Sequence, residues 1–181
     1  MEPIAAILDG RLPVPARTEA ARALSTSTDP RALDALAAAM ESTAEELRDA
    51  CKASLRRLEA PAGFARRLGD AGAGPDVRRN AARALRHLQE PASVPALAAC
   101  LADPDEALRR ECAQALAVFG AAAARDALLG ALSDGSGDVR YMAALALRPL
   151  ASDPEVRAAL EARAGVEADA VVKDELARAL R

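Results

Sequence analysis

Apolar and polar positions follow one pattern that recurs along the chain at a fixed interval. Each copy begins with an apolar residue and a basic residue, continues for three or four residues, and ends in small residues and a leucine. The clearest copies span 77–85, 108–116 and 139–147, so their first residues lie 31 apart twice. Within a copy the apolar positions follow the 3.6-residue period of one helix face. Each copy therefore predicts an amphipathic helix.

The pattern continues on both sides of these copies and alternates with a second apolar segment. Second segments of helical length cover 31–40, 94–101 and 124–132, and Pro3–Leu8 is expected to be the second helix of a truncated leading repeat. A helix pair cannot bury its apolar stripe alone, so a period of this size predicts stacked pairs. We expect one all-α domain over 1–181, with about six helix–turn–helix repeats and a period near 31 residues. The first helices of the repeats are expected to start near positions 16, 47, 77, 108, 139 and 172.

Asp and Pro cluster where one predicted helix gives way to the next. The clusters are Asp29-Pro30, Asp103-Pro104-Asp105 and Asp153-Pro154. Aspartate accepts hydrogen bonds from the free N–H groups of a helix start, and proline fits the first helical turn. These clusters are therefore expected to cap the helices that follow them.

Composition agrees with helices packed at short range and excludes a membrane protein. Half of the residues are apolar and many are alanine, whereas the chain has two Phe, one Tyr and no Trp. Alanine and leucine favour helices over strands. The net charge is −3, and neither a signal peptide nor an apolar run of about 20 residues occurs. We expect a cytoplasmic protein without a membrane contact.

Three cysteines form an odd number without a Cys-x-x-Cys pair. Cys51 and Cys112 lie at the same phase of their repeats, where other repeats carry alanine. We therefore expect both to be small buried residues without a redox or metal role. Cys100 lies on a different helix, and its role stays open.

The string Asp76-Val77-Arg78 followed by Ala81-Ala82 and Ala84-Leu85 resembles the short HEAT-like repeat of phycobilisome lyases, and it recurs from Asp138. The Thr-Pro-Leu-His signature of ankyrin repeats is absent, and the aromatic residues of tetratricopeptide repeats are almost absent. The resemblance covers nearly the whole chain and implies a right-handed α-solenoid. It also implies that an acid opens each first helix and that an arginine packs towards the neighbouring repeat. The residues expected in this structural ladder are Asp76, Arg78, Arg109, Asp138 and Arg140.

Some HEAT-like proteins are enzymes, but the residues that their chemistry needs do not occur here. Deoxyhypusine hydroxylases of this type carry iron on His-Glu pairs, and the corresponding places read Arg110-Glu111 and Asp174-Glu175. The only histidine, His87, is expected to be a surface or helix-end residue. Nucleotide-binding glycine motifs are also absent. We therefore expect no catalytic, cofactor or metal site, and no small-molecule substrate.

A solenoid of this kind binds partners on its concave face, which the second helices line. We expect another protein to bind there, against small residues and scattered charges. The candidate contact residues are Arg31, Asp34, Arg66, Arg67, Arg125, Asp126, Arg157 and Glu161. Two alternatives stay open. One is a nucleic-acid or polyanion binder, because residues 56–86 hold eight arginines against three acids. The other is a chaperone-like subunit of a lyase complex.

Overall fold

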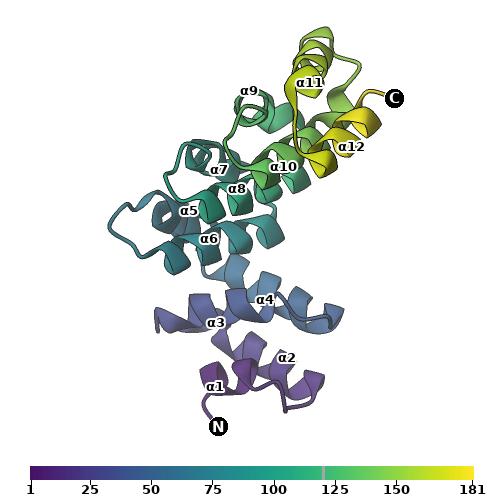
Figure 1. Ribbon diagram of the computed structural model, residues 1–181. Coiled ribbons are helices and arrows are strands. Elements are labelled where there is room, and N and C mark those ends of the chain that lie inside the picture. The colour runs from purple at the N-terminus through teal and green to yellow at the C-terminus, as the bar shows by residue number, and fades with distance from the viewer. Residues whose placement is uncertain (120) are drawn as a thin grey trace. The chain divides into compact units, whose positions relative to one another are not determined.

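The computed structural model describes residues 1–119 and 121–181, which form helices and turns without a strand (Figure 1). The first helices of the repeats are α2 (Val14–Ala23), α4 (Glu45–Arg57), α6 (Pro75–Leu88), α8 (Glu106–Phe119), α10 (Gly137–Leu147) and α12 (Ala170–Ala179). The second helices are α1 (Pro3–Leu8), α3 (Arg31–Ala39), α5 (Ala60–Gly69), α7 (Val94–Cys100), α9 (Ala121–Ala131) and α11 (Pro154–Val166). Each first helix begins two residues before its predicted position. The all-α repeat architecture is confirmed.

The chain divides into two compact units, an N-terminal unit of Met1–Leu88 and a C-terminal unit of Gln89–Arg181. In the N-terminal unit α2 packs against α4, α1 packs against α3, and α6 packs mainly against α5 and α3. In the C-terminal unit the first helices α8, α10 and α12 pack in a row, and the second helix α7 packs against α9 (Figure 1). In the C-terminal unit, first and second helices thus form two layers. The expectation of one domain over 1–181 stays a prediction.

Alanine and leucine from the predicted stripes form the core of both units. In α8, for example, Leu108, Ala113 and Leu116 are fully buried. Val77 is 45% exposed, whereas its counterparts Leu47, Leu108 and Val139 are fully buried. Within the described residues, no helix has the length and apolar character that a bilayer span requires.

Aspartates at the junctions cap the helices as predicted. Asp153 accepts hydrogen bonds from the N–H groups of Glu155 and Val156 at the start of α11. Asp105 accepts one from Ala107 in the first turn of α8, and Asp29 accepts one from Arg31 at the start of α3. A fourth cap, Asp169 at the start of α12, has no proline beside it. These bonds satisfy N–H groups that have no partner inside the helix.

A buried hydrogen bond joins α2 to α4 and gives a stability prediction. The hydroxyl of Ser54 donates to the carbonyl oxygen of Ala21 over 2.8 Å. We expect Ser54→Ala to lower the free energy of unfolding by about 1 kcal/mol, because this inter-repeat bond is lost without replacement by water. Urea denaturation measures the change, with Ser152→Ala on the exposed surface as the control. Equal stability of the two variants would contradict a role for this bond in stacking.

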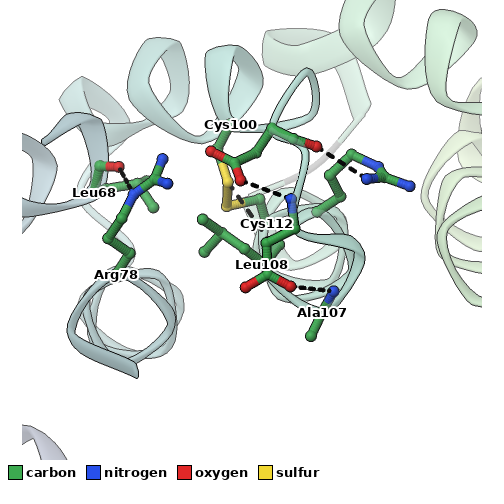
Figure 2. The surroundings of a disulfide bond; sticks show 9 residues. Leu68, Arg78, Cys100, Ala107, Leu108 and Cys112 are labelled. Carbon is green, nitrogen blue, oxygen red and sulfur yellow. Dashed lines mark hydrogen bonds between the residues drawn. A yellow bond between two sulfur atoms is a disulfide. The ribbon is translucent and has the colours of Figure 1, made fainter. Parts of the chain in front are cut away.

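The cysteines follow the prediction at one position and contradict it at another. Cys51 is fully buried and free, and its burial raises the pKa of the thiol to about 12. Cys112 is buried too, but it forms a disulfide with Cys100, with 6.2 Å between the two Cα atoms (Figure 2). The expectation that Cys112 has no redox chemistry is therefore wrong. The α7–α8 hairpin brings the two cysteines together. The sequence comparison aligned first helices only with one another and therefore did not detect a pair between a second helix and a first helix.

Candidate protein-binding surfaces

The second helices carry all eight residues that the sequence offers as partner contacts. Arg31 and Asp34 lie on α3, and Arg66 and Arg67 lie on α5, all in the N-terminal unit. In the C-terminal unit, α9 carries Arg125 and Asp126, and α11 carries Arg157 and Glu161. They form two separate groups, one on each unit.

In the N-terminal unit most of these side chains are held by neighbours. Arg67 donates to the carboxylate of Asp34 over 2.6 Å and thereby joins α5 to α3. The guanidinium of Arg67 also lies 5.7 Å from the ring centroid of Phe64. Arg31 pairs at 2.6 Å with Asp29, at the start of its own helix. Arg66 is exposed and makes no ion pair with any described residue.

The C-terminal group is a network centred on Arg125. This guanidinium pairs with Asp126 on its own helix, at 3.0 Å, and with Glu155 and Asp153 at the start of α11. Its hydrogen bond to Glu155 raises the pKa of Arg125 further above its usual value. Arg157 and Glu161 pair along α11 at 3.1 Å. The network joins α9 to α11 and leaves the Asp126 carboxylate 92% exposed.

A groove lies between α7 and α9 beside this network, and we call it the α7–α9 groove. Its volume is about 440 Å³. Its lining consists of Ala98 on α7 and, on α9, Ala122, Ala124, Arg125, Asp126 and Ala127. Because most of these side chains end at Cβ, a bound segment could approach both helix backbones closely. Arg125 and Asp126 add charges of both signs.

A smaller cavity in the N-terminal unit, of about 180 Å³, lies between α3 and α6. It is lined by Asp34, Ala37, Ala38, Glu41, Asn80 and Arg83. Burial raises the pKa of Glu41, but the hydrogen bond with His87 and the charges of the basic residues on α6 outweigh it and hold this pKa below its usual value. His87 lies in the last turn of α6, as predicted, with its Nε2 3.0 Å from Glu41 Oε1. The pair joins α6 to α3.

Most arginines of the segment 56–86 make hydrogen bonds or ion pairs within the fold. Within the N-terminal unit, five arginines donate to carboxylates or to backbone carbonyls: Arg56, Arg67, Arg78, Arg79 and Arg86. Arg57 and Arg66 are exposed and make no such contact among the described residues. The arrangement favours a structural role for most of this segment over phosphate binding.

The arginine ladder uses acids other than those that the resemblance suggests. Arg109 forms two hydrogen bonds with Asp134, at 2.8 and 3.0 Å, and Arg140 forms two with Glu167, both at 2.8 Å. Each arginine also donates to two carbonyls of the loop before its own helix. The acids lie in the loop before the next first helix, 25 and 27 residues after their arginines. That spacing is the sequence signal by which they could have been found.

The remaining predicted ladder residues make other contacts. Asp138 opens α10 and pairs with Arg110 of α8 at 3.4 Å, on the exposed surface. Asp76 opens α6 and pairs with Arg79 of the same helix. Arg78 donates to the carbonyl of Leu68, at 3.0 Å, within the N-terminal unit (Figure 2).

The repeated helix pairs agree with comparisons to known families. A model of HEAT repeats matches residues 71–148 and 94–181, and a model of the phycobilisome-lyase HEAT-like repeat matches residues 16–42. The two matches to the HEAT-repeat model together cover more than half of the chain. The chain belongs to the HEAT-repeat family. A comparison of this HEAT-repeat protein with curated protein sequences gave no match.

Solved structures with the same fold include natural and designed proteins. Human deoxyhypusine hydroxylase is 25% identical, with 98% of this chain and 71% of that chain covered and a TM-score of 0.57. The complex of CpcE and CpcF of phycocyanin lyase, from a Nostoc species, is 19% identical (84% and 100% covered, TM-score 0.61). A designed armadillo repeat protein in complex with the peptide (KR)4 is also 19% identical (98% and 96% covered, TM-score 0.57). The last two likenesses show a shared fold alone.

Proposed function

We propose that this HEAT-repeat protein is a non-enzymatic interaction module or scaffold, and that the α7–α9 groove holds a helix or loop of a partner protein. The observation that carries the proposal is the alanine lining of a groove of about 440 Å³. A lining of small side chains supports close packing of a partner segment. Arg125 and Asp126 would orient that segment through polar contacts.

The family and the residue inventory support a binding role over catalysis. Stacked helical repeats present extended surfaces that bind other proteins. A designed armadillo protein of similar fold is in complex with a peptide, which illustrates this use of the fold. Iron held by histidine–glutamate pairs needs several imidazole groups, and this chain has one histidine. The lyase-subunit alternative is supported by the shared fold and by the match of residues 16–42 to the phycobilisome-lyase repeat model, which covers one repeat only.

The other candidate contact residues are less central to the proposal than the residues that line the groove. The residues that lie outside the lining of the α7–α9 groove are Arg31, Asp34, Arg66, Arg67, Arg157 and Glu161. Of these, Arg67 and Asp34 join α5 to α3, and Arg157 donates to the carbonyl of Leu180 after α12. The expected cytoplasmic location is weakened by the Cys100–Cys112 disulfide, since disulfides persist mainly in oxidising compartments.

Filling the groove tests the proposal. Ala127→Leu adds bulk at a half-buried position of the lining, and Ala177→Leu adds the same bulk on the exposed face of α12. Partners are captured from lysate of the source organism with and without nuclease, at low and at moderate salt, and are identified by mass spectrometry. The partner is then titrated in purified form. We expect Ala127→Leu to weaken partner binding about ten-fold through steric overlap, and Ala177→Leu to leave it unchanged.

Two results would contradict the proposal. Equal affinity of both variants for the purified partner would place the binding surface outside the groove. Recovery of nucleic acid alone, lost on nuclease treatment and weakened steeply by salt, would favour the polyanion alternative through segment 56–86.

A further inference from the structure

The only tyrosine of the chain lies in a second groove of the C-terminal unit, in the layer of first helices. This groove, which we call the first-helix groove, has a volume of about 320 Å³. Its lining comes from α8, α10, α12 and the residue that precedes α12. The residues are Arg110, Gly137, Asp138, Tyr141, Met142, Asp169, Val171 and Val172.

Part of the lining of the first-helix groove is apolar and accessible. Val171 is 65% exposed, whereas its neighbour Val172 is buried in the core. Tyr141 and Met142 are half-buried on α10, opposite the start of α12. Exposed apolar side chains grouped in a concave surface are typical of a binding site, and methionine adapts its shape to different partners.

The charged residues of the same lining are two acids and one arginine. Asp138 and Asp169 lie in the lining with one cation, Arg110, which already pairs with Asp138 at 3.4 Å. Gly137 allows this arrangement, because a Cβ there would lie 3.2 Å from a carboxylate oxygen of Asp169. The surrounding unit, residues 89–181, has fifteen acids and ten basic residues, a formal charge of −5.

We propose that the first-helix groove binds a basic peptide segment of another protein. A lysine or arginine of that segment would lie near Asp138 and over the ring of Tyr141, where the charge and the aromatic face both attract a cation. An adjacent apolar side chain would pack against Met142 and Val171. The site is independent of the α7–α9 groove, which lies in the layer of second helices, and either site can exist without the other.

Tyr141 provides a direct readout of this binding. Because the chain has one tyrosine and no tryptophan, its intrinsic emission reports on the first-helix groove. The probe is a short peptide of alternating lysine and leucine, with its ends acetylated and amidated. Matched peptides replace lysine by glutamate or leucine by serine. We expect the lysine–leucine peptide to change the Tyr141 emission saturably, and each matched peptide to bind at least about ten-fold more weakly.

Variants locate the site. We expect Asp138→Asn to weaken the lysine–leucine peptide about three-fold and Val171→Ser to weaken it about five-fold. Glu19→Gln removes one negative charge from the exposed surface of α2, outside both grooves, and should leave binding unchanged. The proposal is overturned if no peptide binds, if the glutamate peptide binds as tightly, or if Glu19→Gln weakens binding as much as Asp138→Asn. It is also overturned if binding seen by anisotropy of a labelled peptide leaves the tyrosine emission unchanged.

Discussion

Removing the Cys100–Cys112 disulfide is expected to lower the free energy of unfolding by about 3 kcal/mol. The two cysteines are 12 residues apart and enclose the turn between α7 and α8. The link restricts the unfolded chain more than the folded hairpin, so its loss favours unfolding. The double variant Cys100→Ala/Cys112→Ala, and the wild type in dithiothreitol, should both show this loss in urea denaturation.

Cys51→Ala provides the matched control, because Cys51 is buried and free. This variant should retain its sensitivity to dithiothreitol, whereas the double variant should lose it. A thiol count on the unreduced, denatured wild type should give one free thiol per chain. Three free thiols, or a double variant as stable as the wild type, would contradict a stabilising disulfide.

Arg140→Ala is expected to cost about 3 kcal/mol of unfolding free energy, the second large effect. Its partner Glu167 has a fully buried side chain, which accepts hydrogen bonds from Arg140, from Arg163 and from two backbone N–H groups. Without Arg140 the Glu167 carboxylate stays buried but loses the hydrogen bonds from Arg140 that offset the free-energy cost of its burial. Arg157→Ala breaks an exposed pair and should cost less than about 1 kcal/mol. Similar losses in the two variants would contradict a special role for the ladder.

Glu167 also makes the stability of the fold depend on pH, and the direction of its pKa shift sets the sign. The hydrogen bond from Arg140, joined by backbone N–H groups and opposed by burial, lowers the pKa of Glu167 from 4.5 to about 2. The unfolded state therefore takes up a proton at higher pH than the folded state. The stability from Glu167 is complete above about pH 4.5 and is lost as the pH falls to about 2. Wild type should lose more stability over this range than Glu167→Gln, and parallel pH profiles would contradict the assignment.

The repeat period predicts the helices well because every repeat obeys the same packing requirement. The apolar stripe of each first helix must face its neighbours, so the positions of Leu47, Leu108 and Val139 fix the helix starts to within two residues. Aspartate caps are similarly local signals. Both depend on residues that are close in sequence, which is why the chain alone reveals them.

Contacts between repeats could not be read in the same way. The pairing of Cys100 with Cys112 depends on how a short second helix packs against the next first helix. Asp134 and Glu167 lie in loops, so a comparison of helix stripes misses them, although their spacing from Arg109 and Arg140 is visible in the sequence. Arg125 looked like an exposed contact residue because its acidic partners on the next repeat are 28 and 30 residues away.

Partner binding in the α7–α9 groove is tested most directly by site-specific photocrosslinking. A photoreactive amino acid is placed at Ala127 in one preparation and at the exposed Ala177 of α12 in another. Each is then irradiated in lysate of the source organism. Binding in the groove predicts a discrete protein adduct from Ala127 that is absent from Ala177 and resists nuclease. Adducts of equal yield at both positions, or from Ala177 alone, would contradict it.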